Sequence, residues 1–259
     1  MPALLEIRKL TKRFGGVTAL DGVSLAVGDR ETVGLIGPNG AGKTTLFNCV
    51  TGVLRPQEGS IVFRGEPVVG RAPHEIVGCG IVRTFQNIRL FAGATVLDNV
   101  LVGTHSRTCA GLLRGVALAP SARREERWAR DRAMGLLAFM GIGERVHDAA
   151  GALPFGLQRR LEIARALAAE PSLLLLDEPA AGLNPVEKQQ LLQLIQQLKA
   201  RGLTMLIIEH DMQVVMPISD RIAVLDYGKK IAEGPPKTIQ ADPLVIEAYL
   251  GTKDVKRIS

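Results

Sequence analysis

The stretch Gly37-Pro38-Asn39-Gly40-Ala41-Gly42-Lys43-Thr44 decides the fold of this chain. It fits the phosphate-loop pattern G-x-x-x-x-G-K-[ST], whose glycines let the backbone wrap closely around an anion. An apolar run over 32–36 precedes it as a predicted buried strand, and a predicted helix follows from Thr45. The N-terminus of that helix adds partial positive charge at the same place. A chance glycine turn would lack this combination, so the stretch predicts a nucleoside triphosphate site.

The predicted ATP-binding segment therefore runs from Gly37 to Thr45, with backbone N–H groups directed at phosphate oxygens. The Lys43 ammonium is predicted to reach the terminal phosphates and to serve as a catalytic cation. The Thr44 hydroxyl is predicted to be a ligand of Mg²⁺. ATP and Mg²⁺ are thus the expected cofactors.

The bulk composition is that of a globular protein. The chain has 259 residues, of which 46% are hydrophobic, enough for one large domain or two small ones. No segment approaches the roughly 18 consecutive apolar residues of a membrane span. Glu6, Arg8 and Lys9 interrupt the segment where a signal peptide has its apolar core, so we expect a soluble cytoplasmic protein. The cysteines are too widely spaced for a disulfide framework or a metal knuckle: Cys49, Cys79 and Cys109.

The net charge of +6 does not by itself predict a nucleic-acid partner. The densest basic run, 123–132, holds five arginines together with Glu125, Glu126 and Asp131. Mixed charge of this kind is typical of a solvated helix face. Nucleic-acid surfaces interleave aromatic residues with basic ones, and Trp128 alone does not make a stacking platform. Nucleic acid is therefore the weaker expectation.

Strands and helices are predicted to alternate in the second half of the chain, which implies a parallel sheet with crossovers. We expect a single domain over 1–254, a helical subdomain inserted over 93–156 and a flexible tail over 252–259. Predicted strands cover 5–36 in several pieces, 59–63, 81–86, 173–176, 205–208 and 222–225; predicted helices cover about 95–141 with Thr95 as N-cap, 156–169, and a segment from Pro185 with Asn184 as N-cap.

Two acids follow the apolar run over 173–176. Strand ends of open α/β sheets are where ligands bind, so Asp177 and Glu178 are predicted to lie beside the phosphate loop. Asp177 is predicted to complete the Mg²⁺ shell. Glu178 is predicted to accept a proton from the water that attacks the γ-phosphate. An ordinary strand end with solvated acids is the alternative, and the upstream phosphate loop disfavours it.

The segment over 153–170, Leu-Pro-Phe-Gly-Leu-Gln-Arg-Arg-Leu-Glu-Ile-Ala-Arg-Ala-Leu-Ala-Ala-Glu, decides the class. Here the chain resembles the ATP-binding cassette family, in which the signature of one subunit closes over the triphosphate held by its partner. The resemblance covers nearly the whole chain. It implies an α/β P-loop NTPase fold with an N-terminal antiparallel β subdomain and an inserted helical subdomain. The implied signature and dimer-site residues are Pro154, Phe155, Gly156, Leu157 and Asn184.

Further residues take roles only through this resemblance. Phe14 matches the aromatic that stacks on adenine, although by itself it reads equally well as a core phenylalanine. Gln86 matches the glutamine loop, which senses Mg²⁺ and contacts the membrane partner. His210 matches the switch histidine that contacts the γ-phosphate. The segment 181–184 matches the loop that couples the two sites of a dimer.

Three positions depart from the family pattern. Pro154 stands where the signature has serine and offers neither a hydroxyl nor an N–H, and Leu157 replaces glutamine. Asn184 replaces the common aspartate. Gly156 and the helix end remain as donors, so we expect a working but asymmetric pair of sites and a non-identical partner cassette.

Several stretches resemble the ATP-binding subunits of branched-chain amino-acid importers, namely 83–87, 177–185, 209–212 and 248–251. The resemblance implies a motor subunit on the cytoplasmic face of the inner or plasma membrane, bound to separate permease subunits and indirectly to a solute-binding protein. The alternative is a soluble cassette ATPase that acts on nucleic acid or ribosomes. A regulator without turnover is disfavoured, because Asp177, Glu178 and His210 are all present.

Overall fold

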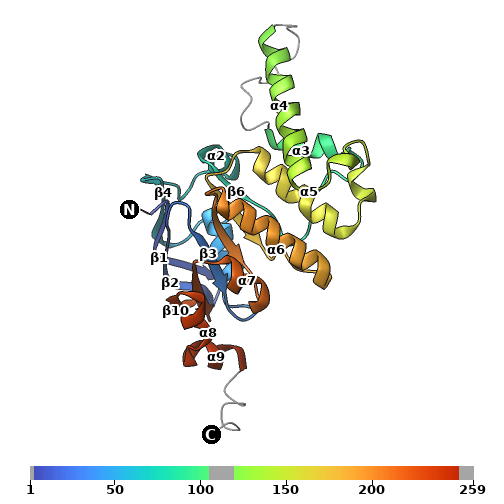
Figure 1. The fold of residues 1–259 in the computed structure, drawn as a ribbon. Helices are drawn as coiled ribbons and strands as arrows, with labels where there is room; N and C mark the ends of the chain where they lie inside the picture. The colour runs from blue at the N-terminus through green and yellow to red at the C-terminus, as the bar shows by residue number, and fades with distance from the viewer. Residues whose placement is uncertain (1–2, 105–119, 251–259) are drawn as a thin grey trace.

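The computed structural model describes residues 3–104 and 120–250, which form two sheets surrounded by helices (Figure 1). The predicted tail over 252–259 lies outside the described residues. So do Cys109 and residues 105–119 of the predicted helical subdomain over 93–156.

The first sheet is antiparallel, with the strand order β2-β1-β4-β5. Its register places Phe14 opposite Val17, so the two intervening glycines make the turn between β1 and β2. The predicted strands over 5–36 and 59–63 are confirmed, although β1 and β2 are long, with 10 and 11 residues. The strands are β1 (Leu5–Phe14), β2 (Val17–Val27), β4 (Glu58–Phe63) and β5 (Glu66–Pro67).

The second sheet has the order β10-β9-β3-β8-β7-β6; its strands run parallel except for β10, which pairs antiparallel with β9. Leu173 and Leu175 of β7 pack in one core cluster, and Leu174 and Leu176 pack in another. Burial on both faces explains why Leu173 to Leu176 of β7 form an unbroken apolar run. The strands are β3 (Thr32–Ile36), β6 (Ile81–Arg83), β7 (Leu173–Asp177), β8 (Thr204–Ile208), β9 (Arg221–Asp226) and β10 (Lys229–Gly234).

Helices cover both faces of the parallel sheet. Helix α1 lies between the two sheets, because its Leu46 and Phe47 share a core cluster with Leu35 of β3 and Ile61 of β4. The other cluster joins the opposite face to α3, α4, α5 and α6. The helices are α1 (Lys43–Val50), α2 (Pro73–Cys79), α3 (Val96–Thr104), α4 (Pro120–Phe139), α5 (Phe155–Ala168), α6 (Pro185–Ala200), α7 (Met212–Ile218), α8 (Pro236–Gln240) and α9 (Pro243–Leu250).

The region predicted as a helical insertion, 93–156, contains α3, α4 and two short 3₁₀ turns, Gly143–Arg145 and Ala150–Ala152. These elements gather on one side of the parallel sheet, where α4 projects away from the body (Figure 1). Thr95 caps α3 as predicted, because its hydroxyl accepts the Asp98 N–H at 3.0 Å. The division into subdomains stays a prediction.

The strand predicted over 81–86 is wrong at its end, since β6 stops at Arg83. The chain leaves the sheet there because side chains of α5 hold the next residues, as described below. Helices α2, α7, α8 and α9 and strand β10 were not predicted. Most of them are short, and they carry too few apolar repeats for a periodic signal.

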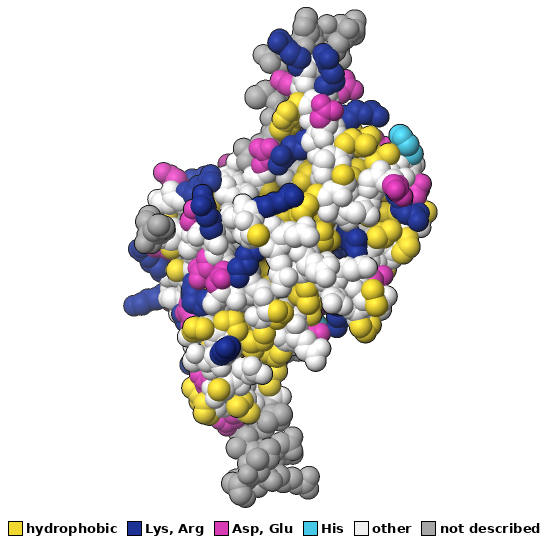
Figure 2. All heavy atoms as spheres, viewed as in Figure 1, with side chains coloured by type: hydrophobic (Ala, Val, Ile, Leu, Met, Phe, Trp, Pro, Cys, Tyr) yellow, Lys and Arg dark blue, Asp and Glu magenta, His cyan; other side chains and the backbone are white. Residues whose placement is uncertain are grey.

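Charges on α4 are mixed, as the sequence predicts. Figure 2 shows basic and acidic side chains intermingled on this helix, with Arg124, Glu126, Arg127 and Asp131 all exposed. Within residues 3–104 and 120–250, none of the helices combines the length and the hydropathy needed to cross a membrane.

Candidate functional site

Four predicted site segments meet at one edge of the parallel sheet, because the carboxyl ends of parallel strands lie side by side. The phosphate loop follows β3, and the next three strands in the sheet order end in the other segments. Strand β8 leads into Glu209 and His210, β7 ends at Asp177, and β6 leads into the glutamine loop.

Two glycines of the phosphate loop adopt conformations that only glycine tolerates there. Gly37 has φ 145° and Gly42 has φ 102°. A Cβ on Gly37 would overlap the Leu225 carbonyl oxygen, and one on Gly42 would overlap that of Ala19. Gly40, with φ 84°, has open space where a Cβ would be. The loop is thus tightly packed at its two ends and open at its middle, which suits the approach of a phosphate.

Lys43 lies inside this loop, with only 6% of its surface exposed. Its ammonium donates hydrogen bonds to the carbonyl oxygens of Gly37 at 2.6 Å and Pro38 at 2.9 Å. Burial lowers the pKa of Lys43, whereas the charges of Glu178 and Asp177 raise it. The cation is therefore held beside the two acids that the sequence places opposite it.

The N-terminus of α1 is suited to an anion. Helix α1 begins at Lys43 after Gly42, its first turn has no acidic residue, and no described side chain caps it. The first N–H groups of a helix need an acceptor from outside the helix. The adjacent Thr44 is exposed, so its hydroxyl is accessible to a ligand at this end.

Gln86, Glu178 and His210 converge in the structure although they come from three separate segments. The Gln86 Nε2 donates to Glu178 Oε2 at 2.8 Å, and His210 Nδ1 lies 3.7 Å from the same oxygen. Glu178 has φ 45°, a left-handed conformation that costs about 1 kcal/mol or more outside glycine. Its carboxylate is held at the end of β7, where its N–H donates to the Ile208 carbonyl.

Glu209 lies next to the cluster of Gln86, Glu178 and His210, and its role was not predicted. Its side chain is fully buried and accepts the Ala180 N–H at 2.9 Å, which ties the end of β8 to the loop after Glu178. Burial raises the pKa of Glu209, and the hydrogen bonds from Ala180 and His210 oppose that rise. The sequence analysis assigns Glu209 no role of its own within the stretch 209–212, because only the fold shows that it is buried.

The glutamine loop is fixed by two buried residues of α5 that the sequence analysis did not single out. Arg159 donates to the carbonyl oxygens of Phe85 at 2.7 Å and Gln86 at 2.8 Å. Glu162 accepts the Phe85 N–H at 3.2 Å and pairs with Arg159 at 2.7 Å. Burial raises the pKa of Glu162, although the charge of Arg159 lowers it. The helix that carries the signature therefore also determines the path of the loop that carries Gln86.

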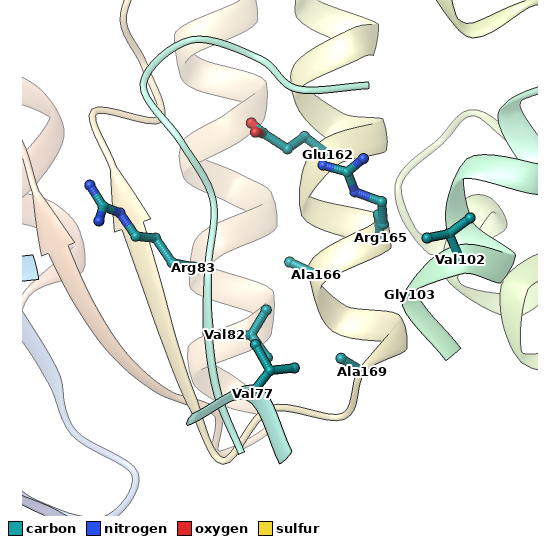
Figure 3. Close-up of a pocket in the computed structure, with 9 residues that line it drawn as sticks. All are labelled: Val77, Val82, Arg83, Val102, Gly103, Glu162, Arg165, Ala166 and Ala169. Carbon is teal, nitrogen blue, oxygen red and sulfur yellow. The ribbon is translucent and has the colours of Figure 1, made fainter. Parts of the chain in front are cut away.

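A cavity of about 210 Å³ lies beside this loop, between α2, β6, α3 and α5 (Figure 3). Glu162 and Arg165 lie close together on α5 in this view, and the guanidinium of Arg83 extends away from α3 and α5. The apolar part of its wall comes from Val77, Val82, Val102, Ala166 and Ala169.

Asp177 has a partner that the sequence analysis missed. Arg83 Nη2 lies 2.7 Å from Asp177 Oδ2, and the two side chains are 7% and 4% exposed. The acid predicted to bind Mg²⁺ is therefore buried next to a fixed guanidinium. Mg²⁺ prefers oxygen ligands. The Asp177 carboxylate and the Thr44 hydroxyl supply such ligands beside the phosphate loop.

The signature residues lie at the start of α5. Pro154 is the exposed N-cap position of α5, and no described side chain caps this helix. Gly156 packs against the Glu187 side chain, and the exposed Phe155 packs against Gly182. Leu157 packs partly against the hydrophobic core. Its side chain thus has a structural role that a glutamine would not fill.

Asn184 caps α6 as predicted. Its side-chain oxygen accepts the Glu187 N–H at 3.0 Å, and the Glu187 carboxylate accepts the Asn184 N–H at 3.1 Å. One turn later, Lys188 pairs with Asp211 at 2.8 Å. This pair joins α6 to the segment directly after His210. The hydrogen bond from Lys188 lowers the pKa of Asp211.

Phe14 and Tyr249 lie at the edges of the site region. Phe14 is 46% exposed at the end of β1, with Lys12 Nζ 5.0 Å from the ring centroid, so it is not a core phenylalanine. The Tyr249 hydroxyl accepts the Gly37 N–H at 2.8 Å. Burial raises the pKa of Tyr249. Helix α9 therefore contacts the first residue of the phosphate loop, 212 positions earlier in the chain.

Comparison with known families decides the class. A family model described as ABC transporter matches residues 20–181, more than half of the chain. The chain belongs to the ABC transporter family. Members of this family are ATP-binding cassettes that hydrolyse ATP to power transport. A second model, described as branched-chain amino acid ATP-binding cassette transporter, matches residues 229–255 of this cassette.

Individual relatives and solved structures agree with this assignment. The cassette is 47% identical to the high-affinity branched-chain amino acid transport ATP-binding protein BraF of Pseudomonas aeruginosa, over 96% of this chain and 98% of BraF. It is 35% identical to an ATP-binding cassette of an ABC transporter crystallised in its ADP conformation, with a TM-score of 0.84 over 97% of this chain and 100% of that one. A dimeric cassette in a post-hydrolysis state, bound to ADP and Pi, gives a TM-score of 0.76 at 25% identity over 90% and 98% of the two chains. The predicted P-loop NTPase fold is confirmed.

Proposed function

We propose that this cassette is the ATP-hydrolysing subunit of an importer for branched-chain or related amino acids. The observation that carries the proposal is the extent of the similarity to BraF, which covers 96% of the chain and is not confined to the nucleotide-binding motifs. The match of residues 229–255 to a branched-chain transporter model supports the same substrate class.

ATP binding is assigned to the segment from Gly37 to Thr45. The open middle of the loop and the uncapped start of α1 would receive the β- and γ-phosphates, and the buried Lys43 would face them. The exposed ring of Phe14 is available to stack on the adenine. Thr44, Asp177 and Gln86 would hold Mg²⁺, which when bound would offset phosphate charge during transfer.

Hydrolysis is assigned to the cluster around Glu178. The side chains of Gln86 and His210 already contact or approach the Glu178 carboxylate, which fixes its orientation. Glu178 would accept the proton of the attacking water, while Lys43 and His210 would stabilise the γ-phosphate oxygens. Phosphoryl transfer depends on positioning and on charge neutralisation more than on covalent chemistry, and this set of residues supplies both.

A second cassette would complete each ATP site. The family resemblance assigns Pro154, Phe155, Gly156, Leu157 and Asn184 to the dimer site, where their donors would act on the nucleotide of a partner. The dimeric cassette among the structural neighbours supports this arrangement. Pro154 has no N–H and Leu157 packs partly against the core, so the signature of this chain would bind phosphate weakly. We therefore propose a non-identical partner and unequal sites.

Permease subunits are the proposed membrane partners, contacted through the loop around Gln86, with a solute-binding protein acting indirectly. The cassette would then lie peripherally on the cytoplasmic face of the inner or plasma membrane. The alternative, a cassette that acts on nucleic acid or ribosomes, is not favoured by the relatives.

ATP-dependent capture tests the transporter proposal. We would bind the Glu178→Gln variant, with ATP, to gently solubilised native membranes and identify the proteins that it retains, using Lys43→Ala as the matched control. Recovery of integral membrane proteins and a second cassette by the Glu178→Gln variant alone is expected. Recovery of ribosomal or DNA-bound proteins without a membrane protein would contradict the proposal.

A further inference from the structure

Arg83 is placed where three parts of the nucleotide site meet. It is the last residue of β6, and three positions later the chain reaches Gln86. Its Nη2 donates to Asp177 Oδ2 at 2.7 Å, at the end of β7. Its Nη1 donates to Asn48 Oδ1 at 2.7 Å, on the helix that begins at Lys43. One guanidinium thus joins the strand before the glutamine loop, the acidic strand and the phosphate-loop helix.

Aromatic rings fix this guanidinium further. Arg83 Cζ lies 5.4 Å from the centroid of the Phe47 ring and 5.3 Å from that of Phe85, within the range of cation–π attraction. Figure 3 shows the side chain leaving β6 on the side opposite the helices α3 and α5. Because both Nη atoms are bonded and the side chain is 7% exposed, Arg83 cannot leave Asp177 without losing several contacts.

The contact has an electrostatic consequence. A carboxylate that is 4% exposed is costly without a positive partner, and Arg83 provides that partner. A divalent cation that binds Asp177 must share the carboxylate with the guanidinium and meets its repulsion at short range. The phosphates of a bound nucleotide supply the negative charge that compensates for this repulsion.

We propose that Arg83 is a positioning residue that holds and neutralises Asp177 before the metal arrives, and that it makes divalent-metal binding depend on bound nucleotide. The inference rests on the proposed role of Asp177 as a metal ligand. It predicts a site that stays folded without metal and binds free divalent ions weakly.

Direct metal binding tests this inference without measuring turnover. Mn²⁺ is titrated into the full chain with and without saturating ADP, and free Mn²⁺ is measured by its paramagnetic resonance signal. Arg83→Gln should bind Mn²⁺ at least about fivefold more tightly than the wild-type protein when ADP is absent, the lower end of typical coupling between linked sites. The difference should shrink with ADP. Metal-free Arg83→Gln should also unfold at a lower temperature, and Mn²⁺ should restore part of that loss.

Two further variants keep the test decisive. Arg83→Lys retains the charge and loses the two-pronged contact, so its Mn²⁺ affinity should stay near that of the wild type. Asn48→Ala removes one hydrogen bond to the Arg83 guanidinium but keeps its charge. It should shift Mn²⁺ affinity in the same direction as Arg83→Gln, by a smaller factor. If Arg83→Gln does not fold, Asn48→Ala tests the proposal in its place.

Failure of the two proposals would look different. If Asp177→Asn leaves Mn²⁺ binding in the presence of ADP unchanged, the proposed metal role of Asp177 is wrong. If Asp177→Asn weakens binding while Arg83→Gln and Asn48→Ala leave it unchanged or weaker, only the inference about Arg83 is overturned.

Discussion

The cluster around Glu178 and the signature at the start of α5 differ in how much of a site one chain provides. Around Glu178, residues from three strand ends contact one another within the single chain, and the cation of Lys43 lies in the adjoining loop. At the signature, Pro154 and Phe155 are exposed, Gly156 packs against the Glu187 side chain of α6, and Phe155 packs against Gly182. One region has its catalytic groups in place, whereas the other offers donors to a partner.

Arg159 and Glu162 connect the two regions physically. They follow the signature on the same helix, and they hold the backbone of Phe85 and Gln86. A movement of α5 relative to the sheet would therefore displace Gln86 from Glu178. The contrast between the regions leads to four predictions.

The largest effect is expected on ATP turnover, from a change in the cluster around Glu178. Glu178→Gln should slow ATP turnover by about 10²- to 10⁴-fold, the usual contribution of a general base. Phosphate release measures turnover, and titration with a fluorescent ATP analogue should show that affinity is retained. Lys43→Ala should instead lose affinity in that titration. Normal hydrolysis by Glu178→Gln would remove Glu178 from its proposed role.

Breaking the buried pair of Arg159 and Glu162 should lower the stability of the fold. Arg159→Met removes the ion-pair partner of the buried Glu162, so the free energy of unfolding should fall by about 3–5 kcal/mol. The double variant Arg159→Met/Glu162→Leu removes both charges and should recover much of that loss. Urea denaturation measures the free energy of unfolding of the single and the double variant. Equal losses in the single and double variants would show that the hydrogen bonds to the glutamine loop, rather than the ion pair, dominate.

Restoring hydrogen-bond donors to the signature should strengthen its interaction with the nucleotide of the partner. Pro154→Ser adds a hydroxyl and an N–H at an exposed position, and should tighten ATP-dependent dimer formation by up to about tenfold, the value of one hydrogen bond. Leu157→Gln should gain less, because it removes an apolar contact with the core. Analytical ultracentrifugation of both variants in the Glu178→Gln background, mixed with the partner cassette, measures the change. No gain from Pro154→Ser would argue against unequal sites.

The smallest effect is expected where the loop after His210 meets α6. Asp211 has a lowered pKa, so its contribution to stability is complete above its ordinary pKa of about 4 and is lost as the pH falls through the lowered value. Asp211→Asn keeps the helix cap of α7 but loses the charge, and should cost at most about 1 kcal/mol at neutral pH. Thermal unfolding should show that the difference in stability between the wild type and Asp211→Asn disappears at acidic pH. A difference that stays constant with pH would assign the effect to the helix cap.

The phosphate loop, the acidic strand end and the N-caps could be predicted because each depends on neighbouring residues. Glycines, a lysine and flanking apolar runs report local geometry, and Thr95 and Asn184 cap helices through residues three positions away. The family resemblance assigned roles to Gln86 and His210, but only the strand order of the folded sheet brings them to Glu178. The end of β6 was mispredicted, because side chains of α5 rather than local propensity take the chain out of the sheet.

The sequence alone thus determined the nucleotide-binding class, the parallel sheet and the segments that lie at its edge. Only the tertiary structure decided which polar groups meet: the Arg83 guanidinium and the Asp177 carboxylate across 94 positions, Arg159 and the Phe85 carbonyl across 74, and the Tyr249 hydroxyl and the Gly37 N–H across 212. The physical reason is that a local motif fixes backbone conformation over a few residues. The partner of a buried charge, by contrast, depends on which elements the packed core brings together.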